Sequence, residues 1–421
     1  MTVFFPAHLD HHFHAMAQAR DMKKLPPRTN KNPFEYGREL SVGELVDRRD
    51  ELVTIRRALT NGSKLFLIGP RRYGKTSLLA TAEAIAEEEG TVVLRFDAER
   101  FPTLDALAQA LLTAAGRRLA TTVDKASELL RRVGGVLLPT VTYDVEKSEW
   151  SVSLGARDKA DAKPLPILID VLDTIERMAG ESKLPVAVII DEFQEIVQNE
   201  GNRAEKQLRA AVQKHKHVSY IFAGSATRLL ADMTGDSNRP FYGLGSRLFL
   251  KALPRDEFKA FLSDGFTQAG FICTDGAIDR ILDAAEEVPY SVQRLAHACW
   301  EETRVSTDLT ITTERVEATI DLVAAQEDSG YTQLWTSLSG VQKNVLIAVL
   351  EEGGVKLMGM GVLKRLGLPL STMRGALTAL EGKGLLRQEQ EKGDIHYRLL
   401  DPLFGLWLEW AGQAKKRALR Y

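Results

Sequence analysis

Apolar runs alternate with helical patterns through the first 250 residues of the chain. The runs KLFLIG at 64–69, TVVLRFD at 91–97, VAVII at 186–190 and VSYIFAG at 218–224 have the length and apolar content of buried strands. Residues between the runs show helical spacing, as in TSLLATAEAIAEEEG at 76–90. Because strands that alternate with helices pair in parallel, the pattern predicts an α/β fold with a mostly parallel sheet.

Two further patterns modify this core. LVDRRDELVTIRRAL at 45–59 places apolar residues at helical spacing and predicts a helix ahead of the first strand. Residues 140–155 alternate apolar and polar positions on both sides of a charged middle, which predicts an inserted β-hairpin. A partner-binding element and an exposed, decorative hairpin are both consistent with this insertion.

The pattern changes after Pro254. Four helical patterns follow without an intervening strand, and they predict a small all-helical domain. From Leu338 onward, three short helical patterns precede two strand patterns at 385–390 and 395–400. Three helices and a two-stranded wing are the order of elements in a winged helix-turn-helix.

The composition excludes a wholly disordered chain and a whole-chain affinity for nucleic acid. At 421 residues, with 44% hydrophobic and 27% charged residues, the chain is long enough for more than one globular domain. Its formal net charge is −2, so any basic site is local. From residue 335 to the last residue, 13 basic residues stand against 8 acidic ones, which is a modest local excess.

The chain has two cysteines, Cys273 and Cys299, and they lack CxxC spacing. This argues against a disulfide framework or a cysteine zinc site. The first residues lack a basic region ahead of a long apolar stretch, and no later segment approaches the roughly 18 apolar residues of a membrane span. We therefore expect a soluble, cytoplasmic protein that does not contact a membrane.

Four histidines lie close together near the start of the chain: His8, His11, His12 and His14. Histidines in this number can bind a metal ion, but no acidic or cysteine partner accompanies them. A short amphipathic or flexible extension is the alternative, and it is the interpretation that we favour.

Residues 69–76 carry the complete G-x-x-x-x-G-K-[ST] pattern between a predicted strand and a predicted helix. In this pattern, glycines let backbone N–H groups surround phosphate oxygens at a helix N-terminus. Lys75 is expected to reach the β and γ phosphates, and the Thr76 hydroxyl to ligate magnesium. The residues predicted to bind ATP or ADP here are Gly69, Pro70, Arg71, Arg72, Tyr73, Gly74, Lys75, Thr76 and Ser77.

An acidic pair, Asp191 and Glu192, follows the apolar run at 186–190. This is the Walker B arrangement, in which Asp191 holds magnesium and Glu192 polarises the attacking water. The alternative is an acidic strand end that caps a neighbouring helix, which would be commonplace without a P-loop.

Ser225 follows the last apolar run and is placed at the same edge of the sheet. Its hydroxyl can contact the γ-phosphate or the attacking water, or it can cap the helix that follows, and both interpretations stay open. The predicted catalytic residues are Lys75, Asp191, Glu192 and Ser225.

With these residues in place, the chain resembles the archaeal ATPase family of the AAA+/STAND P-loop NTPases, a family that also has bacterial members. The resemblance spans residues 32–410 and depends most on GPRRYGKTSLL at 69–79 and DPLFGLWLEW at 401–410. The other blocks, in chain order, are NPF at 32–34, DRRDEL at 47–52, IIDEFQE at 189–195, AGSAT at 223–227, RPFYG at 239–243 and a proline-containing helix at 289–300.

This resemblance implies nucleotide bound between an AAA+ core and a helical lid, followed by a winged helix. Residues Val46, Asp47 and Arg48 would approach the adenine, while Pro289, Gln293 and Arg294 would sense the nucleotide state. The implied segments are a His-rich and basic extension at 1–31, the P-loop core at 32–252, the lid at 253–330, the winged helix at 331–412 and a basic tail at 413–421.

The chain departs from the family pattern at two positions. Val288 stands before the lid proline where relatives often have Gly or His, and Leu244 replaces an arginine that often follows the PxYG block. Arg239 and Arg247 are therefore only candidates for contacting the γ-phosphate of a neighbouring subunit in a homo-oligomer. Solvated surface arginines are the alternative.

Three functions fit these observations. We favour a magnesium-dependent ATPase that acts as a nucleotide-driven conformational switch, with the winged helix engaging a protein or DNA partner. The second is a DNA-engaging initiator or mobile-element helper ATPase, although the second helix of the helix-turn-helix, predicted at 370–384, offers few polar groups. The third is a nucleotide-bound signalling scaffold without turnover, against which Glu192 argues. The groups available for DNA are Ser371, Thr372, Arg374 and Lys383.

Overall fold

The computed structural model describes residues 31–40, 45, 47–119, 137–144, 149–156, 164–200, 202–225, 227–391 and 394–418. The N-terminal histidines, Val46 and the turn of the predicted hairpin lie outside these residues.

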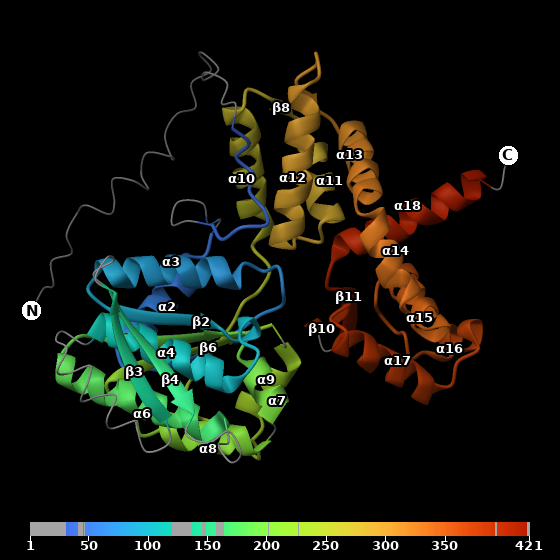
Figure 1. The fold of residues 1–421 in the computed structure, drawn as a ribbon. Coiled ribbons are helices and arrows are strands. Elements are labelled where there is room, and N and C mark those ends of the chain that lie inside the picture. Colours follow the sequence, from blue (N-terminus) through green and yellow to red (C-terminus); the bar gives the residue numbers. More distant parts are fainter. Residues whose placement is uncertain are drawn as a thin grey trace, which may run out of the picture.

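A five-stranded sheet forms the centre of the first half of the chain (Figure 1). Its strand order is β2-β5-β6-β1-β7, and every neighbouring pair is parallel. The carboxyl ends of these strands meet at one edge, since Ile68 lies beside Gly224 and Asp97 beside Asp191. The sheet confirms the predicted α/β fold. Its strands are β1 (Lys64–Ile68), β2 (Val92–Asp97), β5 (Val186–Asp191), β6 (Val218–Gly224) and β7 (Ser246–Phe249).

Alternate side chains of β1 enter two separate hydrophobic clusters, as the two-residue period of a strand requires. Leu65 and Leu67 pack on one face with α2 (Arg49–Thr60) and α3 (Lys75–Glu88). Phe66 and Ile68 pack on the other face with a larger set of helices. These are α4 (Leu104–Leu119), α6 (Pro164–Ser182), α7 (Gln194–Glu200), α8 (Asn202–Val212) and α9 (Thr227–Gly235). Helices thus cover both faces of the sheet, and the edge formed by the carboxyl ends of the strands is available for a functional site.

The predicted insertion is an antiparallel pair of strands, β3 (Leu137–Asp144) and β4 (Glu149–Ala156). β4 lies against α4, on the face of the core away from the P-loop helix α3 (Figure 1). A short 3₁₀ turn, η2 (Ala98–Arg100), follows β2 at the carboxyl edge.

The lid is almost wholly helical. Its helices are α10 (Arg255–Gln268), α11 (Asp275–Ala284), α12 (Pro289–Arg304) and α13 (Thr313–Gln326). Pro289 is the first residue of α12, where its missing N–H costs nothing and its fixed φ suits a helix. The prediction of an all-helical lid missed one small feature, because the pair β8 (Ile272–Cys273) and β9 (Thr310–Ile311) joins two loops.

The last part of the chain is the predicted winged helix. Helices α15 (Gly340–Glu351), α16 (Met360–Leu366) and α17 (Leu370–Gly382) precede a wing made of β10 (Leu386–Glu391) and β11 (Asp394–Leu399). Helix α14 (Asp328–Thr336) leads in from the lid, and α18 (Pro402–Ala418) returns to pack on α11 and α13. Figure 1 shows α18 reaching back to the lid while the wing faces the core.

The lid and the winged helix share one hydrophobic cluster. Phe258 and Trp300 of the lid belong to the same group of buried side chains as Phe404 and Trp407 of α18. The two clusters of the core are separate from it. Among helices in the described ranges, none has the length and apolar character needed to cross a membrane.

Candidate functional site

Residues 69–76 form the turn between β1 and α3, and two of its glycines are required by geometry. Gly74 has a φ of 83° and caps α3 in the left-handed region, which favours glycine. A Cβ on Gly69 would lie 2.7 Å from the Cβ of Leu250. The turn therefore brings its backbone close to the neighbouring strand and directs the N-terminus of α3 toward the carboxyl edge of the sheet.

Lys75 lies at the start of α3 and is buried. Its Nζ donates a hydrogen bond to the carbonyl of Pro70 at 3.3 Å. Burial lowers the pKa of this ammonium, and the nearby carboxylates of Glu192 and Asp191 act in the opposite direction. A buried cation beside two carboxylates is suited to holding the phosphate oxygens of a nucleotide.

Thr76 and Asp191 are in contact across the site. The Thr76 hydroxyl donates to Asp191 Oδ2 at 3.2 Å. Burial raises the pKa of Asp191, while the charge of Lys75 acts to lower it. A hydroxyl and a carboxylate are the hard oxygen ligands that Mg²⁺ takes from a protein when phosphates and water supply the rest. The donor set thus fits the magnesium site predicted from the sequence.

Glu192 is held by donors that converge on one oxygen. Its Oε2 accepts from the Ser225 hydroxyl at 2.8 Å, from the Ser225 N–H at 3.2 Å and from the side-chain amide of Gln194. Burial acts to raise the pKa of Glu192, but Lys75 and these donors outweigh it, so the pKa is lowered. The backbone of Glu192 has a φ of 49°, which is strained for a residue with a side chain.

Sequence reasoning missed Gln194, which is buried at the start of α7. Its amide also lies 3.4 Å from the Ser225 hydroxyl. A Cβ on Gly224 would collide with Gln194 Oε1, so the glycine at the end of β6 makes room for this side chain. The available signal was a glutamine two residues after the acidic pair, but only the fold shows which way it turns.

A cavity of about 310 Å³ lies beside the P-loop, where the core meets the lid. Lys75, Thr76 and Glu192 line its polar side. A group of apolar side chains lines another part: Leu45, Leu253, Phe258 and Pro289. A cavity with one charged end and one apolar part suits the phosphates and the base of a nucleotide.

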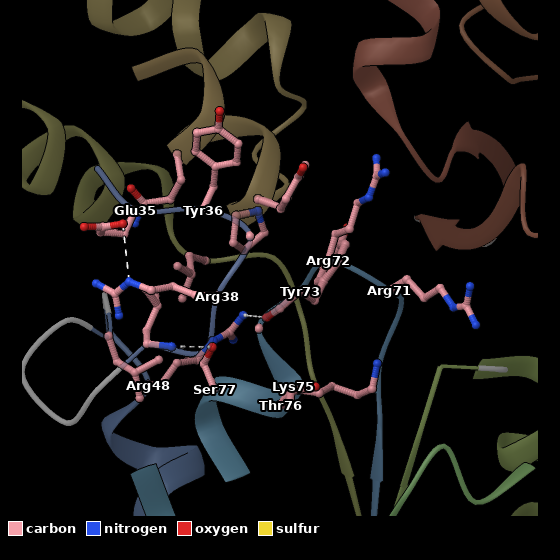
Figure 2. A pocket seen from close by; sticks show the side chains of 18 of the residues that line it. Glu35, Tyr36, Arg38, Arg48, Arg71, Arg72, Tyr73, Lys75, Thr76 and Ser77 are labelled. Atoms are coloured by element: carbon pink, nitrogen blue, oxygen red, sulfur yellow. Dashed lines mark hydrogen bonds and ion pairs between the residues drawn. The ribbon is translucent and has the colours of Figure 1, made fainter. Parts of the chain in front are cut away.

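The cavity is also lined by residues that sequence reasoning did not select. Figure 2 shows Glu35, Tyr36 and Arg38 across the cavity from Thr76 and Ser77. Gly37 and Leu40 belong to the same lining. These residues precede the P-loop by more than 25 positions, so no local pattern connects them to it.

The predicted adenine-side residues have different positions. Arg48 is buried at the cavity, and its guanidinium donates to the carbonyl of Lys251 at 2.8 Å and pairs with Glu51. Asp47 is not among the lining residues, and Val46 is outside the described part of the chain.

In the lid, Pro289 and Gln293 line the cavity, but Arg294 does not. The guanidinium of Arg294 pairs with Glu327 and lies 5.7 Å from the centre of the Tyr36 ring. The structure therefore does not bring this predicted nucleotide-binding residue to the cavity wall, because its charge is used within the lid.

Three neighbouring P-loop side chains point in different directions. All three line the cavity, and Arg71 also pairs with Glu99 at 3.3 Å. The guanidinium of Arg72 pairs with Asp401 of the winged helix. The ring of Tyr73 is buried beneath Arg387 of the wing, 5.6 Å from its guanidinium. Figure 2 shows Arg72 directed away from Thr76.

The two candidate arginines differ in environment. Arg239 donates from Nε to Glu205 at 3.1 Å, and the Glu205 side chain is fully buried. Arg239 is thus paired with a buried carboxylate of the core, although 25% of its own side chain is exposed. Arg247 is exposed on the edge strand β7 and lies 5.8 Å from the centre of the Phe249 ring.

Family comparisons agree with this architecture. Residues 59–230 match the family described as "AAA domain", and residues 329–410 match the one described as "Probable winged helix domain". Together with the parallel sheet, the P-loop and the acidic pair, these matches show an AAA domain followed by a C-terminal winged helix, as in AAA+ P-loop ATPases. This confirms the predicted resemblance at the level of the AAA+ class, and it supports ATP binding and ATPase activity.

The comparison with solved structures identifies proteins of similar fold. A Walker-type ATPase of Pyrococcus abyssi has a TM-score of 0.59 at 18% identity, and the match covers 90% of this chain and 99% of that chain. This likeness shows the fold. The Aeropyrum pernix ORC1 protein in complex with DNA has a TM-score of 0.46 at 13% identity, covering 87% of this chain and 93% of that one.

The Thermotoga maritima RuvB Holliday junction branch migration motor has a TM-score of 0.41 at 14% identity, covering 87% of this chain and 96% of that chain. No curated protein sequence matches the chain at a significant level.

Proposed function

We propose that this ATPase is a nucleotide-driven switch in which the winged helix is the moving, output-bearing part. The observation that carries the proposal is the ion pair between Arg72 of the P-loop and Asp401 at the start of α18. A residue between the two P-loop glycines thereby contacts the winged helix directly. A nucleotide that rearranges this turn would change the free energy of that contact.

Arg72 also connects the P-loop to the lid. Its carbonyl accepts from the N–H of Tyr290 at 3.3 Å, and its guanidinium lies 4.8 Å from the centre of the Tyr290 ring. Asp401 in turn accepts from the Tyr331 hydroxyl at 2.8 Å. Arg72 has a φ of 70°, so its backbone is held in a strained region while it makes these contacts. Strain of this kind is typical of sites that change conformation with ligand.

A second contact lies beside the first. Arg387 of the wing covers Tyr73, lies 4.0 Å from Glu286 of the lid and pairs with Glu389 at 2.7 Å. Burial raises the pKa of Glu286, and Arg387 and Arg398 act to lower it. P-loop, lid and wing therefore meet in one polar junction.

The winged helix contacts the lid and the P-loop through different kinds of side chain, and this difference indicates which parts of the molecule move. The lid and winged helix share one continuous apolar cluster, which is costly to open. The winged helix meets the P-loop through charged and aromatic groups instead. Partly exposed ion pairs break at lower cost than an apolar core. We therefore expect lid and winged helix to move together relative to the core, as in a hinge closure.

The chemistry assigned to the site follows from the same geometry. Magnesium held by Thr76 and Asp191 would neutralise charge on the β and γ phosphates. Lys75 binds the phosphate oxygens, and Glu192 orients and polarises the attacking water. Ser225 and Gln194 fix the carboxylate of Glu192 in place. Loss of Lys75 or Glu192 should stop turnover.

The proposal is tested by fluorescence energy transfer between dyes at exposed Val53 of the core and exposed Met360 of the winged helix. Both positions would be changed to cysteine in a Cys273→Ser, Cys299→Ser background. We expect Mg-ATP to change the transfer efficiency in this protein and in Glu192→Gln, and to leave it unchanged in Lys75→Ala. The same efficiency with saturating ATP, ADP and no nucleotide would rule the switch out.

DNA is a second candidate partner, because α17 leaves Ser371, Thr372 and Arg374 exposed. Duplex DNA binding that weakens with salt and responds to ATP would favour this role. Binding without stimulation of ATP turnover, or no binding, would favour a protein partner. A protein that binds ATP and never turns it over would instead be a nucleotide-bound scaffold.

A further inference from the structure

Residues 32–40 run from the lid to the core over the nucleotide cavity, and we call them the strap. Figure 1 shows this segment passing along α10 before it bends toward α3. We propose that the strap is a gate for nucleotide exchange that opens at its core end and stays attached to the lid. The proposal rests on the nucleotide site described above and concerns how ligand enters and leaves it.

The lid end of the strap is firmly anchored. Phe34 is fully buried in the lid, where its ring centre lies 4.6 Å from that of Phe266 and 5.7 Å from that of Phe261. A Cβ on Gly265 would lie 2.7 Å from the Phe34 ring, so α10 carries a glycine where the ring docks. The carbonyl of Phe34 also contacts His297 Nδ1 at 2.7 Å. Detaching this end would expose a large aromatic side chain.

Asn32 adds hydrogen bonds to the same end. Its Oδ1 accepts from the Phe34 N–H at 3.1 Å, and its Nδ2 donates to the carbonyl of His297 at 3.1 Å. The first bond turns the chain locally, and the second fixes this turn on α12. The lid end is therefore held by both packing and hydrogen bonds.

The core end is held more weakly. The N–H of Leu40 donates to the Ser77 hydroxyl at 3.0 Å, and Glu39 pairs with Arg95 at 3.0 Å. The Glu39 side chain is 43% exposed, so solvent screens this pair. Among the described residues, this end is held by one backbone hydrogen bond and by the Glu39–Arg95 pair, in which two guanidinium nitrogens contact the two carboxylate oxygens. Residues 38–40 have no side chain buried as Phe34 is, so we expect the strap to release here first.

The middle of the strap covers the cavity and contains a glycine, Gly37, at which the backbone can turn. Glu35, Tyr36, Gly37 and Arg38 all line the cavity. Gly37 has a φ of 81°, and a Cβ there would meet nothing within 4 Å. The turn therefore favours glycine because of its left-handed backbone and not because of close packing. Because Ser77 lies next to Thr76 on α3, the releasable end is tied directly to the helix that holds the phosphates.

A gate has a kinetic signature that a simple binding contact lacks. A segment that must move aside slows entry and exit by the same factor, so removing it raises both rates and leaves the equilibrium affinity unchanged. A lost contact with the bound ligand raises the dissociation rate alone. The two cases are separated by measuring both rates.

The experiment is stopped-flow binding of the fluorescent nucleotide mant-ADP to the full chain. Glu39→Gln removes the exposed ion pair without altering a cavity-lining residue. We expect association and dissociation rates to rise together by about two- to fivefold, the factor that one exposed ion pair supports. Phe34→Ala detaches the anchored end, and both rates should rise by more than about tenfold.

The matched control is Glu89→Gln, which removes an exposed ion pair with Arg56 near the far end of α3. Its rates should equal those of the wild type. Unchanged rates in Glu39→Gln, or a rise in its dissociation rate alone, would overturn the gate. This test remains valid even if Phe34→Ala disturbs the folding of the lid. Failure of the proposed switch would give a different result. The rates of mant-ADP binding would still depend on the strap, but the winged helix would not move.

Discussion

At the scale of single residues, Gly224 shows how a missing side chain shapes the catalytic edge. It ends β6, and its carbonyl accepts from the N–H of Gly69 in the P-loop turn. The space beside it is filled by Gln194 and Leu230. Because Gln194 donates to Glu192, the glycine indirectly positions the carboxylate assigned to water activation.

Gly224→Ala should therefore damage both stability and turnover. The new methyl would lie 2.6 Å from Leu230 Cδ1 and would displace Gln194, so we expect a loss of about 1–3 kcal/mol in unfolding free energy. The control is Gly375→Ala at an exposed position of α17, where a Cβ meets nothing within 4 Å and should stabilise by about 0.5–1 kcal/mol. Urea unfolding and ATP turnover measure both effects, and a neutral Gly224→Ala would contradict this account.

Arg239 gives a second prediction at the scale of single residues. It was a candidate for contacting a neighbouring subunit, yet its guanidinium is the partner of fully buried Glu205. Arg239→Met should cost about 3–5 kcal/mol in unfolding free energy, because it leaves a buried carboxylate without its counter-charge. Arg304→Met, which breaks an exposed pair with Glu301, should cost less than about 1 kcal/mol. Equal effects in chemical denaturation would show that Arg239 is free for another role.

At the scale of elements, α18 carries two kinds of contact. Its first turn begins beside Asp401, which pairs with the P-loop, and its apolar face packs into the lid. Phe404 and Trp407 stack with ring centres 5.7 Å apart, and Tyr331 packs against both. One helix thus connects the apolar lid cluster to the polar junction at the nucleotide site.

Phe404→Ala should destabilise the joint lid and winged helix by about 3–5 kcal/mol, since the side chain is 1% exposed. Met360→Ala, at a 68% exposed position of the same domain, should change stability by no more than about 0.5 kcal/mol. Hydrogen exchange would locate the effect. Loss of protection in both α13 and α17 is expected, while loss confined to α17 would show that the two domains do not share a core.

Elements were also what the sequence predicted best. The buried strands, the P-loop and the wing each have a local signature in apolar periodicity or in glycine spacing, because the physics that creates them is local. The roles of Arg72 and Gln194 were missed for the opposite reason. Arg72 lies within a motif that predicts phosphate contact, and its partner Asp401 is more than 300 positions away.

The strap illustrates the same limit. NPF at 32–34 was recognised as a family block, yet nothing local indicates that Tyr36 and Arg38 line the nucleotide cavity. Likewise, Arg294 has the position expected of a sensing residue on α12 but pairs with Glu327. Contacts between distant segments depend on how whole domains pack, and one sequence carries no direct signal for them.

At the scale of the whole molecule, we expect the lid and the winged helix to move as one body relative to the core. Lid and winged helix share an apolar cluster, and the core has two further clusters, one of which also includes Val288 at the start of the lid helix α12. Between them lie the nucleotide cavity and the polar junction of Arg72, Tyr73, Arg387 and Asp401. This distribution of apolar and polar contacts favours movement at the nucleotide site rather than between lid and winged helix.

The most direct test of the central claim is energy transfer between core and winged helix in Asp401→Asn. This change removes the charge that pairs with Arg72 and substitutes none of the cavity-lining residues. We predict that ATP turnover continues while the difference in transfer efficiency between the ATP and ADP states shrinks by at least about half, because the contact that transmits the state of the P-loop is weakened. An undiminished difference, with normal turnover, would show that the Arg72–Asp401 pair does not couple nucleotide to the winged helix.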